Sequence, residues 1–357
     1  METRATPAPL HSAAAEARTA RMPDMEAKLH CLESFLAASD AGALPQRIET
    51  HMSWVLLGKT QVLKLKKPVV YPPVDYSSLE ARECNARREL RLNRRLAPDV
   101  YLGLLALQWH GGTLSAVAEA YIQPGRQTVD WAVVMRRLPQ ARMLDGVIRR
   151  GELEPGDIDA LGATLSAFYR SAVRAAVDEG EYVARLRHGI ALSARMLERA
   201  AFALPLVREV CQGTNEALTL HEGLLRARVA EGRIVEGHGD LRAEHVCLVE
   251  PPTVFDALEF DARLGEVDPF DELCFLGLEC DMAGDASIGP LLCTRIAAAL
   301  DDAPAPALLR LYTAKNALMR ARLSVAHLME PDPRHPEKWL PQASRYLKRA
   351  HMALSGP

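Results

Sequence analysis

HGDLRAEHVCLVEPPTVFDALEF, residues 238–260, gathers histidines and carboxylates around two short apolar runs. The runs, 246–249 and 254–255, are typical of β-strands, and the double proline between them indicates a hairpin turn. Asp240 then lies in the loop before the first strand, and Asp256 lies at the end of the second. A rigid scaffold often presents catalytic groups in such places, so we expect both carboxylates to carry chemistry.

The composition is that of an ordinary globular protein. A chain of 357 residues is long enough for two lobes with separate cores. The apolar and charged fractions, 48% and 25%, argue against disordered and fibrous classes. The net charge of −3 does not favour a nucleic-acid partner. The 7 cysteines form no CxxC pair, which favours reduced thiols and a cytoplasmic location. No apolar run approaches the roughly 18 residues of a membrane span, so no membrane partner is expected.

The order of elements predicts two unequal lobes. Residues 1–24 are Ala-rich and broken by charges and proline, so we expect a flexible tail. Residues 25–138 contain one helix, several β-rich runs and a second helix that starts at the capping-box spacing of Ser77 and Glu80. Residues 139–357 are mostly helical apart from the quoted stretch. We predict an α+β fold with a β-rich N-terminal lobe, a helical C-terminal lobe and a cleft between them.

Two lysines and a glutamate of the first lobe suit a phosphate site. QVLKLKK puts Lys64 and Lys66 on one face of a strand, because side chains alternate with period two. Glu89 lies on the apolar stripe of the second helix, where a carboxylate is costly unless it is paired. We expect Lys64, rather than Lys66, to pair with Glu89, because it ends the apolar-apolar-Lys pattern of kinase-like sites.

The chain resembles the aminoglycoside phosphotransferase family of the kinase-like fold. HGDLRAEH keeps the His, Asp and Leu of the catalytic-loop pattern H-R-D-L-x-x-x-N, and Lys64, Glu89, Asp240 and Asp256 follow in the family's order. The segments ETHMSW, LKLKKPV and FDALEF resemble an uncharacterised bacterial branch, and the likeness covers roughly residues 25 to 330. It implies a bilobal fold and an ATP- and Mg²⁺-dependent transfer of phosphate to a hydroxyl of a small molecule.

The resemblance also implies a role for each site residue. Asp240 would be the base for the substrate hydroxyl, and Asp256 would bind Mg²⁺. Lys64 would hold the α- and β-phosphates, with Glu89 as its orienting partner. The backbone from Met135 to Arg137 would form the hinge that meets the adenine. His238, at the start of the catalytic loop, would brace that loop by hydrogen bonds.

Two positions depart from the family's pattern. The turn ETHMSW between the first two predicted strands has no glycine, so side chains such as Ser53 would contact the phosphates instead. His245 stands where the metal-binding Asn is expected, and imidazole suits Mn²⁺ better than the oxygen-seeking Mg²⁺. We therefore take His245 as a candidate metal ligand, with Glu244 or Glu259 as a further oxygen donor.

Two other hypotheses remain at this stage. A pseudokinase that binds nucleotide or a partner without efficient catalysis would explain the glycine-free turn and His245. A metal-dependent hydrolase would use His238, Asp240, His245 and Asp256 as Zn²⁺ or Mn²⁺ ligands, but it leaves the strand lysines and the helix glutamate without a role. The sequence does not identify the acceptor, and it leaves the oligomeric state open.

Overall fold

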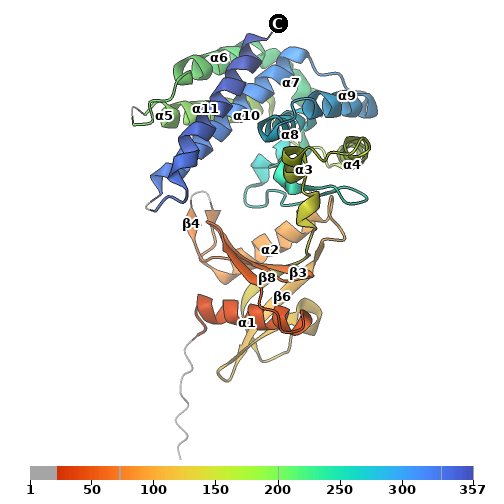
Figure 1. The fold of residues 1–357 in the computed structure, drawn as a ribbon, viewed down its shortest axis with the longest axis vertical. Helices are drawn as coiled ribbons and strands as arrows, with labels where there is room; N and C mark the ends of the chain where they lie inside the picture. Colours follow the sequence, from red (N-terminus) through yellow and green to blue (C-terminus); the bar gives the residue numbers. More distant parts are fainter. Residues whose placement is uncertain (1–21, 72–73, 200, 331, 357) are drawn as a thin grey trace, which may run out of the picture.

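The structure is a computed structural model that describes residues 22–71, 74–199, 201–330 and 332–356. The predicted tail, residues 1–24, lies outside the described residues except for its last three. A β-rich part and a helical part lie at opposite ends of the molecule (Figure 1). Within the described ranges, no helix is both long and apolar enough to cross a membrane.

A six-stranded antiparallel sheet forms the β-rich part. Its strands, in spatial order, are β1 (Gln46–Glu49), β2 (Ser53–Leu57), β3 (Gln61–Lys66), β8 (Gln127–Arg136), β6 (Tyr101–His110) and β7 (Thr113–Ala118). The Gly58-Lys59 turn joins β2 to β3 in one hairpin, and the Gly111-Gly112 turn joins β6 to β7 in another. A short pair, β4 (Val70–Tyr71) and β5 (Val74–Asp75), follows β3.

Two helices cover the two faces of this sheet, and the alternation of side chains along β3 decides what each helix meets. Leu63 and Leu65 pack in one apolar cluster with the leucines of α1 (Met25–Ser39). The residues between them, Lys64 and Lys66, point to the opposite face, which α2 (Leu79–Asn93) covers. The sheet therefore has one dry face under α1 and one face with charged groups under α2.

Helix α2 begins one residue later than predicted. Its N-cap is Ser78, whose hydroxyl accepts from the amide of Ala81 at 3.1 Å. The predicted start at Ser77 is wrong, because the amide of Ser77 donates to the side chain of Asp75 and so belongs to the preceding turn.

The second part of the chain is mostly helical, as predicted. Its helices are α3 (Leu144–Arg150), α4 (Asp157–Ser171), α5 (Glu179–Leu197), α6 (Val207–Leu220), α7 (Glu222–Ala230), α8 (Pro269–Ala283), α9 (Ile288–Leu300), α10 (Pro306–Ala326) and α11 (Pro336–Ser355). Two short antiparallel pairs interrupt them, β9 (Val235–Glu236) with β12 (Glu266–Val267) and β10 (Val246–Cys247) with β11 (Thr253–Val254). The α+β prediction is confirmed.

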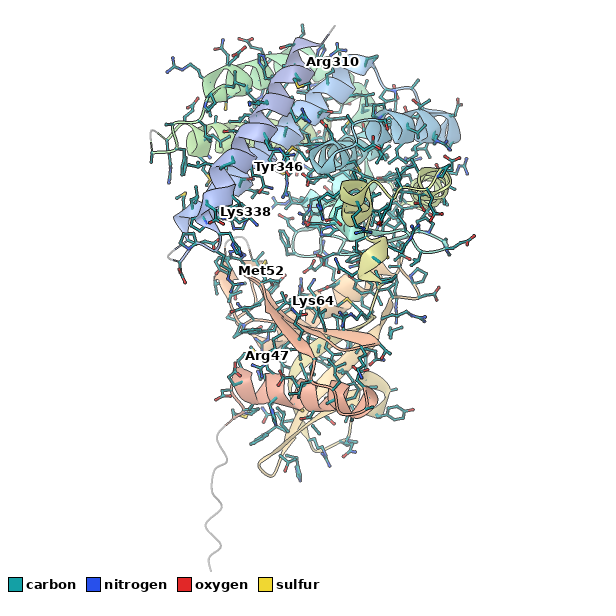
Figure 2. The ribbon with its side chains drawn as sticks, viewed as in Figure 1. Arg47, Met52, Lys64, Arg310, Lys338 and Tyr346 are labelled. Atoms are coloured by element: carbon teal, nitrogen blue, oxygen red, sulfur yellow. The ribbon has the colours of Figure 1, made fainter. Side chains whose placement is uncertain are left out.

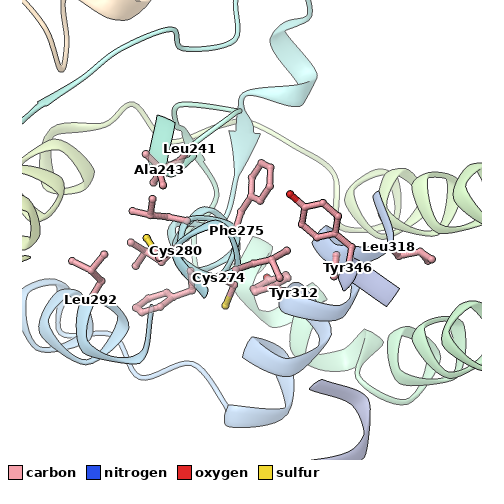
Figure 3. Close-up of a cluster of buried hydrophobic side chains, with 14 of the residues drawn as sticks. Leu241, Ala243, Cys274, Phe275, Cys280, Leu292, Tyr312, Leu318 and Tyr346 are labelled. Carbon is pink, nitrogen blue, oxygen red and sulfur yellow. The ribbon is translucent and has the colours of Figure 1, made fainter. Parts of the chain in front are cut away.

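The core of the helical part also anchors the loop that carries Asp240. Figure 3 shows side chains of α8, α10 and α11 gathered in one cluster, with Leu241 and Ala243 of the loop at its edge. Leu241 is fully buried and Ala243 nearly so, whereas Asp240 itself remains partly exposed. Burial of the neighbouring apolar side chains therefore fixes the loop and leaves the carboxylate outside the core.

Helices α8 and α9 touch through two glycines. A methyl group on Gly277 would lie 2.6 Å from the Cα atom of Gly289, and one on Gly289 would lie 2.8 Å from the Cα atom of Gly277. No real side chain tolerates such an approach to backbone, so both positions require glycine although each lies within a helix.

Replacement of Gly277 by alanine is expected to destabilise the protein, because the two helices must move apart. We expect Gly277→Ala to lower the free energy of unfolding by about 1–3 kcal/mol in urea denaturation. Gly189 is the matched control, since it lies exposed in α5 and an added methyl meets nothing within 4 Å. Gly189→Ala should raise the free energy of unfolding, by at most about 1 kcal/mol. Equal stabilisation by both changes would contradict the tight crossing.

Candidate active site

Two lysines of β3 share one glutamate of α2. Lys64 Nζ lies 2.8 Å from Glu89 Oε1, and Lys66 Nζ lies 3.0 Å from Glu89 Oε2. Glu89 is fully buried, so its charge depends on these partners. The predicted Lys64–Glu89 pair is present. The expectation that Lys64 pairs in place of Lys66 is wrong, because the two oxygens of one carboxylate serve both ammonium groups.

The network keeps its members ionised. Burial alone would raise the pKa of Glu89, but the Lys64 and Lys66 ammonium groups outweigh it and hold that pKa below its usual range. Burial would likewise lower the pKa of Lys64, yet the carboxylates of Asp256, Glu89 and Glu259 raise it well above its usual value. Opposite charges at short distance thus overcome desolvation on both sides.

Asp256 reaches the same lysine from the other side of the cleft. Its Oδ1 accepts from Lys64 Nζ at 2.8 Å, and its amide donates to the hydroxyl of Tyr101 at 3.2 Å. Its backbone has φ of 61°, in the left-handed region that non-glycine residues seldom occupy. Burial would raise the pKa of Asp256, but Lys64 and His245 together hold it well below its usual range. An ionised carboxylate in a constrained backbone therefore faces the cleft.

Glu259, predicted as a further metal ligand, is engaged by a lysine. Its Oε1 lies 2.5 Å from Lys66 Nζ, and both side chains are buried. The second lysine therefore ties the loop after β11 to the sheet. Sequence analysis placed Lys66 on the correct face of β3 but assigned it no partner.

His238 braces the loop that carries Asp240 by hydrogen bonds, as the resemblance implies. Its Nε2–H donates to the carbonyl of Phe255 at 2.9 Å, and its Nδ1 accepts from the amide of Asp240 at 3.2 Å. Burial lowers the pKa of His238 to about 4, so the ring is neutral. Gly239 adds a second tie, because its amide donates at 2.5 Å to Glu272, a buried carboxyl of α8 whose pKa burial raises to about 7.

Asp240 and His245 are joined through Arg242. Arg242 Nη2 lies 2.9 Å from Asp240 Oδ2 and donates to His245 Nε2 at 3.1 Å. The other ring nitrogen, Nδ1, donates to the carbonyl of Asp240 at 2.9 Å. His245 Nε2 is also 3.7 Å from Asp256 Oδ2, so the predicted closeness of these two residues is confirmed. Sequence analysis missed Arg242, although its place two residues after Asp240 was visible.

The glycine-free turn between β1 and β2 is closed by its own side chains. Thr50 Oγ1 accepts from the amide of Ser53 and donates to its carbonyl, each at 2.9 Å. Ser53 is almost fully buried and lines the cleft together with Thr50 and His51. The structure thus brings the turn to the cleft where the sequence predicts it, on the same side as Lys64 and Lys66.

These residues surround a cleft of about 660 Å³ between the two parts. Lys64 projects into this region from the sheet (Figure 2). The lining of the cleft combines apolar side chains with ammonium groups and carboxylates. The apolar part comes from both parts of the molecule and includes Val55, Val62, Val100, Leu138 and Phe255. A cleft with both kinds of lining suits a ligand that has an apolar ring and a charged group.

The structure changes which backbone amide of the predicted hinge could meet a ligand. The amides of Arg136 and Arg137 donate to the carbonyls of Val100 and Thr60, each at 2.8 Å, so neither is free to meet a ligand. Within the described ranges, the amide of Leu138 donates to no protein acceptor. The sequence contains a sign that Leu138 lies beyond the paired strand, because residue 139 is a proline and strand pairing ends before it.

The hydrolase hypothesis loses one of its ligands. Both ring nitrogens of His238 are occupied by backbone groups, which leaves no lone pair for a metal ion. Among the described residues, the cluster whose ligand atoms all lie within 4.8 Å of one another is instead His51, His327 and Glu330, at the mouth of the cleft.

Sequence comparison finds relatives of unassigned function. No protein-family model matches the chain. Uncharacterised proteins of Mycobacterium tuberculosis and Mycobacterium bovis are each 31% identical over 291 residues, which cover 80% of this chain and 55% of the relative. The chain therefore spans about half the length of the curated relatives that it matches.

Solved structures resemble the chain over most of its length. A choline/ethanolamine kinase family protein from Mesorhizobium loti has a TM-score of 0.54 at 16% identity, covering 91% of this chain and 94% of that protein. An aminoglycoside phosphotransferase from Streptomyces rimosus has a TM-score of 0.44 at 17% identity, covering 84% and 99% respectively. The similarity to the first of these, with the antiparallel sheet and the helical remainder, shows that the chain has the bilobal kinase-like fold.

Proposed function

We propose that the chain is a phosphotransferase that moves the γ-phosphate of ATP to a hydroxyl of a small molecule. The observation that carries the proposal is the position of Lys64, held at 2.8 Å by both Glu89 and Asp256 in a cleft lined by apolar and charged side chains. Phosphoryl transfer needs positioned charges more than covalent chemistry from the protein, and this arrangement supplies them. The kinase-like fold raises the expectation but does not carry it.

The nucleotide would occupy the cleft with its base against the apolar side chains. The amide of Leu138 is the candidate donor to the base, because the two amides before it are already used. Lys64 would hold the phosphates while Glu89 keeps its ammonium group in place. Ser53 and Thr50 lie in the turn beside the phosphates, on the wall formed by β1 and β2.

A divalent cation fits this site in part. Asp256 offers an ionised carboxylate that is 41% exposed, and His245 Nε2 lies 3.7 Å from it. This nitrogen accepts from the Arg242 side chain, which a cation would have to displace, whereas the nitrogens of His238 are bound by backbone groups. Glu259 has one oxygen already bound by Lys66, so it is a weaker candidate ligand. Oxygen ligands suit Mg²⁺, whereas a mixed oxygen and nitrogen set suits Mn²⁺. When bound, the cation would neutralise charge on the transferred phosphate.

Asp240 would orient the acceptor hydroxyl and take its proton. Arg242 holds Asp240 Oδ2, which leaves Oδ1 for the acceptor. The hydroxyl oxygen forms a bond to the γ-phosphorus as the bond to the β-phosphate oxygen breaks, and ADP leaves. The loop is held by His238, Glu272 and the core around Leu241, so the carboxylate needs little rearrangement.

A pseudokinase is the second candidate, and two observations favour it. The turn between β1 and β2 bonds to itself through Thr50 and Ser53 instead of offering free glycine amides. Asp256, the proposed cation ligand, is bound by Lys64 in this state. Nucleotide binding without phosphate transfer to any hydroxyl would support this alternative.

Nucleotide binding tests the proposal directly. ATP at 100 times its Kd should stabilise the folded protein by about 2.7 kcal/mol, seen as a rise in Tm. A divalent cation should add to the rise in the wild type but not in Asp256→Asn, which removes the charged ligand. Asp332→Asn, at an exposed position far along the chain, is the control and should behave as wild type. Absence of any response to ATP, with and without cation, would contradict the proposal.

The choice of cation tests the role of His245. We expect the wild type to bind ATP more tightly with Mn²⁺ than with Mg²⁺, because a nitrogen ligand suits the transition metal. His245→Asn supplies an amide oxygen, so it should improve Mg²⁺-dependent binding. His221→Asn, which changes a histidine outside the cleft lining, is the control. If both cations act equally and His245→Asn changes neither, His245 only hydrogen-bonds the loop.

A further inference from the structure

A second cleft of about 450 Å³ opens beside the catalytic loop. It shares Asp145 and Glu244 with the nucleotide cleft, and it continues under α11. Asp240 itself lines the nucleotide cleft, and Arg242 pairs both with Asp240 and with the shared Glu244. A molecule that reaches from the second cleft past this shared wall would approach the carboxylate proposed as the base.

The carboxylates of this second cleft are already neutralised. Asp145 is paired with Arg149, one turn along α3, and Glu244 is paired with Arg242. Glu279 receives Arg320 at 3.0 Å and the hydroxyl of Tyr346 at 2.7 Å. A cationic acceptor needs a free carboxylate to replace its hydration, and each of these three already has a cation of its own.

Two cations that line the second cleft, in contrast, have no carboxylate partner among the described residues. Lys338 and Arg345 lie on the face of α11 that lines it, two turns apart, or about 10 Å along the axis. Within the described ranges, neither has a carboxylate within ion-pair distance. Arg345 donates to the carbonyl of Met282 at 2.8 Å, and Lys338 Nζ lies over the ring of Trp339, 4.1 Å from its centroid. In Figure 2 Lys338 lies at the end of α11 nearest the sheet, whereas Arg310 lies at the far end of the molecule.

We propose that the second cleft binds small hydroxylated anions, with the carboxylate or phosphate of the acceptor on Lys338 and Arg345 and a hydroxyl toward Asp240. The proposal rests on the proposed function, because it names the class of acceptor for the same reaction. Among the described residues neither cation has a carboxylate partner, whereas the carboxylates of the cleft are already paired, and this favours an anion over an amine. The long apolar stems of Lys338 and Arg345 let their charged ends turn onto a ligand.

Binding to the ADP-loaded protein tests the acceptor class. Calorimetric titration with glucose 6-phosphate and glucuronate is compared with glucose and glucosamine. We expect each anion to bind at least 10-fold more tightly than its neutral or amino counterpart. The double variant Lys338→Ala/Arg345→Ala should lose this preference, and Arg310→Ala should keep it. A preference for glucosamine, no saturable anion binding, or binding unchanged in the double variant would overturn the proposal.

The two proposals fail in distinguishable ways. If ADP raises the Tm but no anion binds, the acceptor class is wrong and the phosphotransferase proposal stands. If the anions bind but no nucleotide does, the anion site stands and the proposed reaction is wrong.

An independent cluster lies where the turn between β1 and β2 meets the end of α10. His51 Nε2 and His327 Nδ1 approach the same oxygen of Glu330, at 2.9 and 2.8 Å. All three ligand atoms lie within 4.8 Å of one another. The ring of His327 is stacked on Trp339 at 4.0 Å between centroids, which fixes its orientation.

We infer that this cluster is a site for Zn²⁺ or a similar transition-metal ion. Two histidine nitrogens and one carboxylate oxygen form a common donor set for zinc, with a fourth position left for water. The donors come from both parts of the molecule, so a bound ion would fasten the turn at the cleft mouth to the helical part. It is separate from the cation proposed beside Asp256, which serves the nucleotide.

Titration with Zn²⁺ alone tests this site. The wild type should show saturable binding of one Zn²⁺ and a rise in Tm. Co²⁺ in its place should give the visible absorption band of a Co²⁺ ion with a low coordination number. His327→Ala should lower the affinity at least 10-fold. His335→Ala is the control, because the His335 ring is exposed and, among the described residues, its one carboxylate neighbour within 4 Å is Glu337. Equal Zn²⁺ affinity in wild type and His327→Ala, or no saturable binding, would overturn the inference.

Discussion

The buried carboxylate of Glu89 is the constraint on which the rest of the site depends. A charge with no exposure to water is tolerated only when cations meet it, and here two ammonium groups of one strand do so. This requirement fixes α2 against β3 and sets which residues of the helix and the strand face each other. Because Lys64 and Lys66 each reach a second carboxylate, Asp256 and Glu259, the same requirement extends across the cleft to the helical part.

Lys64 and Lys66 differ in their contacts and in their exposure. Lys66 is buried, and its contact with Glu259 ties the loop after β11 to the sheet. Lys64 is more exposed and holds Asp256, whose amide donates a hydrogen bond to the Tyr101 hydroxyl and whose backbone has an unusual φ. Both lysines therefore join the two parts of the molecule, and Lys64 is the more accessible of the two to a ligand. Two ammonium groups face three carboxylates in all, so the network carries excess negative charge where a cation is proposed.

The sequence predicts those features that depend on local pattern. Alternation along β3 put Lys64 and Lys66 on one face, and the apolar stripe of α2 placed Glu89 opposite them. The two short apolar runs and the double proline between them predicted the hairpin that separates Asp240 from Asp256. Contacts between distant segments were not predictable in this way. Nothing near Glu330 indicates that it meets His51, 279 residues earlier. The face of α11 lines the same cleft as Ala243 and Glu244 of the loop because α10 and α11 pack together. The pairing of Lys66 with Glu259 depends on how the two lobes lie relative to each other.

The contact between Lys64 and Asp256 has a thermodynamic consequence. Asp256 Oδ1 and the Lys64 ammonium group are bound to each other. A cation that took this oxygen would release Lys64, and phosphates that drew Lys64 away would release Asp256. Whichever ligand broke the contact first would leave a free group for the second. Linkage would then require the effect to be mutual, so that cation and nucleotide would each raise the affinity for the other by the same factor. A single ion pair would thus make two ligands cooperative without any movement of the lobes.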